Sequence, residues 1–237
     1  MSRIASPVSV EEGYGRWAAT YDQDPNPLLA REERHLLPLI AGSPGKQVLD
    51  IACGTGRWLK RLSERGGSFG LDSSSAMLQI ARDKSAWPNR LARGNCEQLP
   101  FRDRAFDLAV CSFALAHLSD LKSTAEELAR VLQPGSNLFV SDLHPEAIAH
   151  GWRVGFRDGS ALLEIDASVH AADNVIQSFR HEGFSCVTEE PLWLGEPEKT
   201  IFERSGKSSY FREACEIPAV IVFHFRRTGS SFNRSFS

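Results

Sequence analysis

The sequence has no long hydrophobic run, no closely paired cysteines and no surplus of positive charge. No stretch of about 18 apolar residues occurs, and residues 1–15 contain no apolar signal segment, so we expect no membrane span and no export. The five cysteines are widely spaced and form no Cys-x-x-Cys motif, which argues against a disulfide framework and a zinc site. These absences predict a cytoplasmic protein.

The charges of the chain are nearly balanced. It has 27 lysines and arginines against 30 aspartates and glutamates, a formal net charge of −3, so we expect no nucleic-acid partner. Its 237 residues, of which 42% are hydrophobic and 24% charged, are typical of one globular domain. We expect this domain to be a monomer or a homodimer.

Short apolar runs alternate with amphipathic stretches between residues 47 and 143, a pattern typical of a parallel sheet with crossover helices. Residues 106–113 form a nearly continuous apolar run, which suits burial on both faces and predicts a central strand. The expected elements are strands at 47–52, 68–72, 90–94, 106–113 and 136–143 and helices at 56–64, 73–84 and 121–135. We therefore predict an α/β, Rossmann-like fold with helices on both faces of the sheet.

Both flanks of this core carry further elements. Residues 9–40 predict two helices separated near Pro25 and Pro27, and the Arg157-Asp158-Gly159 segment predicts a β-hairpin. A helix at 171–184 and strands at 185–194 and 217–227 follow. The single domain is expected to consist, in chain order, of an N-terminal helical cap (1–45), the core (46–143), a hairpin insertion that caps the sheet (144–170), the C-terminal part of the sheet (171–227) and a flexible tail (228–237).

The most informative segment is residues 48–58, in which an apolar strand leads through Gly54-Thr55-Gly56 into a helix. Glycines at such a turn allow a ligand to approach the backbone closely, as nucleotides do. The dinucleotide fingerprint needs a third glycine where Leu59 stands, and residues 42–47 have the wrong spacing for a P-loop. The segment therefore disfavours NAD, FAD and ATP.

Two carboxylates narrow the choice of ligand. Asp72 ends the second predicted strand, where a carboxylate can accept hydrogen bonds from two ribose hydroxyls. Asp50 adds a negative charge beside the loop, which suits a ligand with a cationic ammonium and sulfonium. S-adenosylmethionine fits both acids. The alternative is that Asp72 only caps the next helix and the glycines only form a tight turn.

Four segments, in order and spacing, resemble the class I S-adenosylmethionine-dependent methyltransferases, in particular the small-molecule, methyltransferase type 11 branch that includes enzymes of ubiquinone and menaquinone biosynthesis. They read VLDIACGTGRW (48–58), GLDSSSAML (70–78), GNCEQLPFRDRAFDLAVCSFALAHL (94–118) and LARVLQPGSNLFVSDLHP (128–145). The resemblance covers residues 10–227. It implies a seven-stranded, mostly parallel sheet with an antiparallel last strand, S-adenosylmethionine as cofactor and S-adenosylhomocysteine as product.

The resemblance also implies a set of cofactor contacts. The methionine part would lie against the first loop, the ribose on Asp72, the adenine beside the next helix, and the sulfonium near the end of the fourth strand. Where the family usually has Gly-Asp-Ala, this chain has Gly94-Asn95-Cys96, and Asn95 can still accept a hydrogen bond. The expected cofactor-binding residues are Tyr21, Asp50, Ala52, Cys53, Gly54, Thr55, Gly56, Asp72, Ser73, Met77, Asn95, Cys96, Glu97, Ser112 and Phe113.

Histidines and aromatic residues are the candidates on the acceptor side. His117 and His144 follow the fourth and fifth strands, at the edge where open α/β sheets bind ligands, and are candidate catalytic bases unless both are structural. Aromatic residues in the cap and the insertion favour an apolar or aromatic acceptor, unless they are ordinary core residues. The expected acceptor-binding residues are Tyr14, Trp17, His117, His144, Trp152 and His170. Asp142 alone cannot supply the carboxylates of a metal site, so we expect no metal.

We therefore expect an S-adenosylmethionine-dependent methyltransferase that moves a methyl group to an oxygen, nitrogen or carbon of a small acceptor by in-line displacement. The aromatic stretch from Tyr14 to Tyr21 and the hairpin at 152–165 are expected to close over the bound cofactor. Two other interpretations stay open: a regulatory or scaffold protein that binds the cofactor without transfer, and an NAD(P)-dependent Rossmann oxidoreductase.

Overall fold

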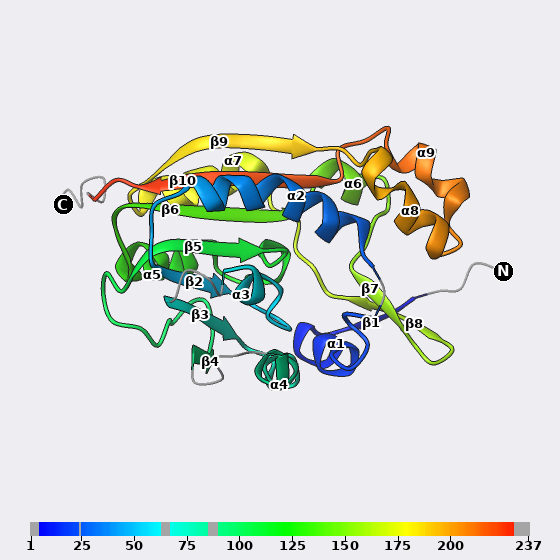
Figure 1. Cartoon of the computed structure of the whole chain (residues 1–237), viewed down its shortest axis with the longest axis horizontal. Coiled ribbons are helices and arrows are strands. Elements are labelled where there is room, and N and C mark those ends of the chain that lie inside the picture. The colour runs from blue at the N-terminus through cyan, green and yellow to red at the C-terminus, as the bar shows by residue number, and fades with distance from the viewer. Residues whose placement is uncertain (1–4, 24, 63–66, 85–89, 230–237) are drawn as a thin grey trace.

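Seven strands form the main sheet of the computed structural model, which describes residues 5–23, 25–62, 67–84 and 90–229 (Figure 1). In their order across the sheet they are β4 (Leu91–Arg93), β3 (Gly67–Asp72), β2 (Gln47–Ile51), β5 (Phe106–Ser112), β6 (Leu132–Leu143), β10 (Val220–Arg227) and β9 (Phe184–Leu192). Neighbouring strands are parallel except for β10, which runs antiparallel to both β6 and β9. The predicted Rossmann-like sheet with an antiparallel last strand is confirmed.

β5 occupies the centre of this sheet, as its apolar run predicts. Leu108 and Val110 belong to the core cluster on one face, and Ala109 and Cys111 belong to the cluster on the other. Successive side chains of a strand point to opposite faces, so a strand covered on both sides needs apolar residues at consecutive positions. The parallel pairing with β2 and β6 brings the carboxyl ends of the three strands to one edge of the sheet.

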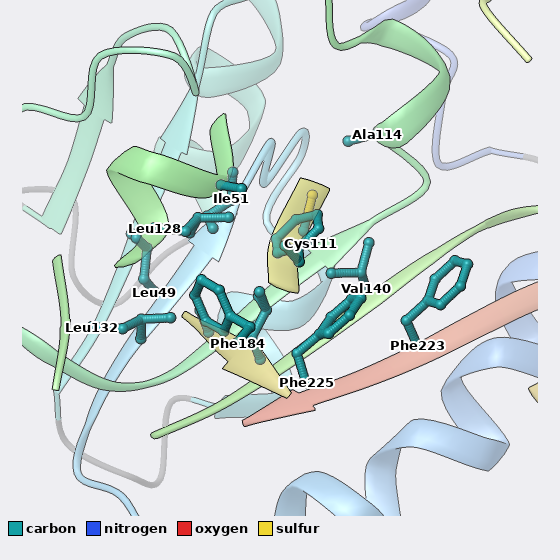
Figure 2. Packing of buried hydrophobic residues seen from close by; sticks show 14 of the residues in the cluster. Leu49, Ile51, Cys111, Ala114, Leu128, Leu132, Val140, Phe184, Phe223 and Phe225 are labelled. Atoms are coloured by element: carbon teal, nitrogen blue, oxygen red, sulfur yellow. The ribbon is translucent and has the colours of Figure 1, made fainter. Parts of the chain in front are cut away.

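Helices cover both faces. On the face of Ala109, α5 (Leu121–Val131) and α7 (Ala172–His181) pack against the sheet, and Figure 2 shows Phe184 and Phe225 within this cluster. The opposite face is covered by α2 (Pro27–Gly42), α3 (Arg57–Leu62), α8 (Glu196–Arg204) and α9 (Phe211–Ala214). The other helical segments outside the cap are α4 (Ser75–Lys84), α6 (Pro145–Ala149), η3 (Leu115–His117) and η4 (Ser208–Tyr210). Within the described ranges, no helix combines the length and the apolar character needed to cross a bilayer.

The N-terminal cap consists of α1 (Val10–Trp17) and α2, which confirms the two predicted helices. Ser9 caps α1 by accepting a hydrogen bond from the amide of Glu12, and Asn26 caps α2 in the same way through the amide of Leu28. Pro27 lies in the first turn of α2, where no amide hydrogen is needed. It therefore begins this helix rather than interrupting it.

The predicted hairpin of the insertion is present as β7 (Gly155–Asp158) and β8 (Ala161–Ile165), and Gly159 in its turn has a left-handed φ of 58°. β8 also pairs in parallel with β1 (Ser6–Val8), a short strand that the sequence pattern did not predict. This second sheet holds the hairpin beside α1 (Figure 1). The hairpin therefore packs as one unit with β1 and α1, the first part of the cap.

The predicted helix at 121–135 is too long. The helix ends at Val131, because Leu132 has an extended conformation and pairs with Phe106, so residues 133–135 belong to β6. The helices α6, α8 and α9 were not predicted, although Gly195 before Glu196-Pro197 is a recognisable helix start. The end of the predicted helix at 56–64 and most of the predicted tail at 228–237 lie outside the described residues.

Candidate active site

The loop from Ala52 to Gly56 joins β2 to α3 and has an unusual backbone. Ala52, Gly54 and Gly56 have left-handed φ angles of 54°, 53° and 81°. A Cβ atom added to Gly54 would meet no atom within 4 Å, so this side of the loop is open to a ligand. A Cβ atom added to Gly56 would lie 3.3 Å from the Cβ atom of Ala81. Gly54 thus leaves room for a ligand, whereas Gly56 allows α4 to pack closely.

Asp72 holds this loop from the end of β3. Its Oδ2 accepts a hydrogen bond of 2.8 Å from the amide of Gly54, and its Oδ1 accepts one of 2.8 Å from the amide of Ser74. The carboxylate is 9% exposed. Each carboxylate oxygen has a second lone pair, so Asp72 can also accept from the two hydroxyls of a ribose. Its structural role and its predicted ribose contact are therefore compatible.

Asp50 lies beneath the same loop and is 2% exposed. Its Oδ2 has no hydrogen-bond partner among the described residues. The pKa of Asp50 is raised to about 8, mainly by burial, against the lowering effect of the positive charge of Arg57; the negative charges of Asp72 and Glu32 contribute to the rise. A cationic ligand near Asp50 would stabilise its ionised form. The site thus has an unsatisfied acid where the cationic end of the predicted cofactor would lie.

A buried ion pair, which the sequence analysis missed, joins the cap to this loop. The fully buried Glu32 of α2 accepts a hydrogen bond of 2.5 Å from Nη2 of Arg57, the first residue of α3. Ser112 and Ser141, at the ends of β5 and β6, both donate to Oε1 of Glu32. Arg57 Nη2 lies 2.7 Å from Ser112 Oγ. The predicted cofactor residue Ser112 is therefore part of this network.

A second polar contact joins the cap to the loop. Thr55 donates a hydrogen bond of 2.9 Å from Oγ1 to Oδ1 of Asp22, whose other oxygen pairs with Lys84 of α4. Tyr21 lies directly before Asp22, and burial raises its pKa to about 12. The charges of Arg57 and Asp72 both act on Tyr21. Tyr21 is therefore placed beside the loop, where the sequence analysis expects it to close the cofactor site.

Aromatic side chains of the cap, the hairpin and η3 form one group. Trp17 stacks on Phe156 of β7 with ring centroids 5.0 Å apart, and it contacts Tyr21 at 4.8 Å. Tyr14 packs against Trp17 at 6.1 Å, and its Oη lies 2.9 Å from Nε2 of His117. Burial raises the pKa of Tyr14, and the charges of Tyr21, Asp142 and Asp72 raise it further. The structure thus brings together Tyr14, Trp17 and His117, which the sequence analysis expects to bind the acceptor.

The residues expected near the adenine lie on β3–α4 and on the loop after β4. Ser73 is exposed and Met77 is buried on α4. Asn95 Oδ1 accepts from the amide of Glu97 at 3.0 Å, and burial raises the pKa of Cys96 to about 12. Glu97 accepts hydrogen bonds from the amide of Asp120 and the hydroxyl of Ser119, at the start of α5. This loop is therefore fixed to α5 through Glu97.

Other predicted residues have different surroundings. His144 caps α6, because its Nδ1 accepts from the amide of Glu146 at 3.1 Å. Trp152 and Phe113 pack at the edge of the core cluster that contains Leu108, and Phe113 has a left-handed φ of 51°. His170 lines a small pocket with Asp142, and its Nε2 has no partner among the described residues. Neither His144 nor His170 hydrogen-bonds to Tyr14 or His117 within the described ranges.

Asp142, near the end of β6, is hydrogen-bonded to η3. Its carboxylate accepts hydrogen bonds from the amides of Ala116 and Leu143, and burial raises its pKa to about 6. The sequence pattern does not indicate this contact of Asp142. Across the part of the chain that the structure describes, no three His, Cys, Asp or Glu side chains gather in a way that could hold a metal ion.

Part of the chain is similar in sequence to known methyltransferases. Residues 49–140 match the family model described as a methyltransferase domain. The chain is 36% identical over 137 residues to the demethylmenaquinone methyltransferase of Lactiplantibacillus plantarum, covering 51% of this chain and 56% of that protein. It is 33% identical over 150 residues to the 2-phytyl-1,4-naphtoquinone methyltransferase of Synechocystis sp., covering 57% and 63%. The matches thus span less than two thirds of either relative.

Solved structures share the fold at lower identity. An S-adenosylmethionine-dependent methyltransferase from Mesorhizobium loti has a TM-score of 0.64 and 19% identity, covering 84% of this chain and 100% of that one. A geranyl diphosphate methyltransferase in complex with GPP and sinefungin has a TM-score of 0.62 and 14% identity, covering 84% and 78%. These likenesses support the fold, and the family match covers the segment that builds the loop and the central strands.

We predict that Glu32→Ala destabilises the protein by about 3 kcal/mol, because it removes the close partner of the partly buried Arg57 and leaves only Glu33, at 3.7 Å. Urea unfolding measures the loss. The exposed Glu203 of α8 provides the control, and Glu203→Ala should leave the free energy of unfolding unchanged. A combined Glu32→Leu, Arg57→Met variant should recover part of the loss, since it removes both charges. Equal stability of Glu32→Ala and Glu203→Ala would contradict the role of the ion pair.

A second prediction concerns the pH dependence of stability. The folded protein keeps a proton on Asp50 up to about pH 8, whereas the unfolded chain releases it near pH 4. The resulting stabilisation is complete below about pH 4 and is lost as the pH rises through about 8. Asp50→Asn should therefore gain stability relative to the wild type between about pH 5 and pH 8. Urea unfolding across this pH range measures the difference, and Asp173→Asn, at an exposed position, is the control. Parallel curves of unfolding free energy against pH for all three proteins would refute the prediction.

Proposed function

We propose that the chain, whose residues 49–140 match the methyltransferase-domain family, transfers the methyl group of S-adenosylmethionine to a small aromatic acceptor of the phenol or hydroquinone type. The observation that carries this proposal is the position of the aromatic group. The ring of Tyr14 lies 6.3 Å from that of Tyr21, and the next residue, Asp22, accepts a hydrogen bond from Thr55 of the glycine loop, to which Asp72 is also hydrogen-bonded through Gly54. An acceptor beside Tyr14 would therefore lie next to a cofactor held by Asp72.

The described residues fit the cofactor in three ways. Gly54 leaves the loop open, Asp72 has lone pairs available for ribose hydroxyls, and Asp50 has a buried oxygen without a partner. When bound, S-adenosylmethionine supplies a methyl group on a positively charged sulfur, which leaves as a neutral thioether. Asp50 and Asp72 attract that positive charge, and Tyr21 excludes water from it. Ser73, Met77, Asn95 and Cys96 are proposed to surround the adenine.

The aromatic side chains of the cap and the hairpin indicate the chemical class of the methyl acceptor. Tyr14 and Trp17 are half-buried, with Trp17 stacked on the buried Phe156, and their aromatic rings favour a ring over a charged or aliphatic acceptor. The relatives from Lactiplantibacillus and Synechocystis carry naphthoquinone-type compounds in their names, which supports the same class. Methyl transfer mainly requires the acceptor atom to be aligned with the sulfur–methyl bond, and rigid aromatic walls serve this alignment.

We also propose a domain layout, a location in the cell and roles for three further residues, as the sequence predicts. The cap of residues 1–45 and the insertion of residues 144–170 would form the acceptor side of the single domain. A cytoplasmic location is supported by the five cysteines, all of which are free thiols. His144, Trp152 and His170 would act at the margin of the acceptor site, since His144 caps α6 and His170 lines the pocket beside Asp142.

We predict that the protein binds S-adenosylhomocysteine at one site per chain and that Asp72→Ala weakens this binding at least about tenfold, through the loss of its hydrogen bonds. Isothermal titration calorimetry measures both affinities. Asp173→Ala, on the exposed surface of α7, is the control and should bind as the wild type does. Saturable NAD binding without a response to S-adenosylhomocysteine would instead favour the oxidoreductase interpretation.

The transfer itself is tested with S-adenosylmethionine that carries a labelled methyl group. We expect label to appear on 1,4-naphthohydroquinone or on simple phenols, and not on aliphatic amines or carboxylic acids. Asp72→Ala should reduce the rate at a fixed cofactor concentration, and Asp173→Ala should not. A protein that binds the cofactor normally but labels none of these compounds would be a binding or scaffold protein rather than a methyltransferase of this class.

A further inference from the structure

The hydrogen bonds of His117 fix which ring nitrogen carries its proton. Nδ1 lies 3.3 Å from the backbone carbonyl oxygen of Asp166, and Nε2 lies 2.9 Å from Oη of Tyr14. A carbonyl oxygen can only accept, so Nδ1 must carry the hydrogen and Nε2 must be the bare nitrogen. The hydroxyl of Tyr14 therefore donates to His117. The lone pairs of the Tyr14 oxygen remain available to another donor.

This arrangement differs from direct catalysis by His117. Both ring nitrogens are already engaged, so the imidazole has no free lone pair to offer an acceptor. Tyr14 shares the aromatic group with Trp17 and lies within the field of both Asp72 and Asp142. The group best placed to meet an acceptor hydroxyl is therefore the oxygen of Tyr14, with His117 behind it.

We infer that Tyr14 and His117 form a proton relay, in which the Tyr14 oxygen takes the proton of an acceptor hydroxyl while its own proton passes to Nε2 of His117. This relay rests on the proposed function, and it supplies the general base that the proposed methyl transfer to a hydroxyl requires. The acceptor oxygen gains a negative charge, His117 becomes an imidazolium, and Tyr14 ends with a proton as it began. The electron pair of the acceptor then bonds to the methyl carbon, and the sulfur keeps the electrons of the broken bond.

Burial keeps both partners neutral before the acceptor arrives. It raises the pKa of Tyr14 and lowers the pKa of His117. Before the acceptor binds, the neutral Tyr14 hydroxyl therefore donates its hydrogen bond to a neutral imidazole. The ionisable groups whose charges act on Tyr14 are Tyr21, Asp72 and Asp142, and His117 faces Asp166 only through its backbone carbonyl. A neutral imidazole is a modest base, so the relay suits an acidic hydroxyl of a phenol or hydroquinone and not that of an aliphatic alcohol.

A series of phenols of graded acidity tests the relay. Tyr14→Phe keeps the stacking on Trp17 but removes the hydroxyl, and it should lower kcat for weakly acidic phenols about a hundredfold. Transfer to 4-nitrophenol, supplied as the phenolate at alkaline pH, should change by less than about twofold, because no proton then has to be removed. His117→Gln should show the same dependence, and the double variant should be no slower than either single variant. Tyr210→Phe, at an exposed position, is the control.

The relay and a purely structural contact give different results. If Tyr14→Phe slows all phenols equally, including the phenolate, the hydrogen bond only holds the cap and the relay is overturned. If the wild type transfers to none of the phenols, the proposed function fails, and a spectroscopic measurement still decides on the relay. With S-adenosylhomocysteine bound, 4-nitrophenol should show a stronger phenolate absorbance on the wild type than on Tyr14→Phe or His117→Gln. Equal absorbance on all three proteins would overturn it.

Discussion

The buried carboxylate of Glu32 is the constraint on which the arrangement of this site depends. It comes from the N-terminal cap, yet its partners are Arg57 at the start of α3 and two serines at the ends of β5 and β6. A buried charge is tolerated only when its partners are in place, so the cap, the loop and the central strands have to meet in one arrangement. Arg57 directly follows Gly56, and the pair therefore also fixes the end of the glycine loop.

The position of the cap determines what lies over the strand ends. Asp22 accepts from Thr55, and α1 brings Tyr14 and Trp17 against His117 and the hairpin. The pairing of β1 with β8 holds the hairpin on the same side (Figure 1). One N-terminal segment thus contributes to both halves of the site, so a movement of the cap would open the cofactor side and the acceptor side together.

Much of the fold, but only part of the site, can be predicted from the sequence. Strands, the glycine loop and Asp72 follow from local patterns, because burial on both faces requires apolar runs and a tight turn requires glycine. Glu32 lies in an amphipathic helix, where a glutamate normally faces solvent, and Arg57 is 25 residues away. Tyr14 and His117 are 103 residues apart, so only the folded chain shows that they meet. The helix end at Val131 was mispredicted because the pairing of Leu132 with Phe106 is likewise non-local.

The two halves of the site have opposite electrostatic character, and the proposed reaction makes use of this. Asp72, and Asp50 once a cation stabilises its ionised form, would provide negative charge where the positively charged sulfur would lie, whereas Tyr14 and His117 rest neutral among aromatic rings. Methyl transfer turns the sulfur neutral and so removes one of the two positive charges that would stabilise an ionised Asp50, whose pKa burial raises to about 8. The product would keep its amino-acid, ribose and adenine contacts and lose only the attraction between the acids and the sulfonium. The same buried acid that favours binding of the charged cofactor thus favours release of the neutral product.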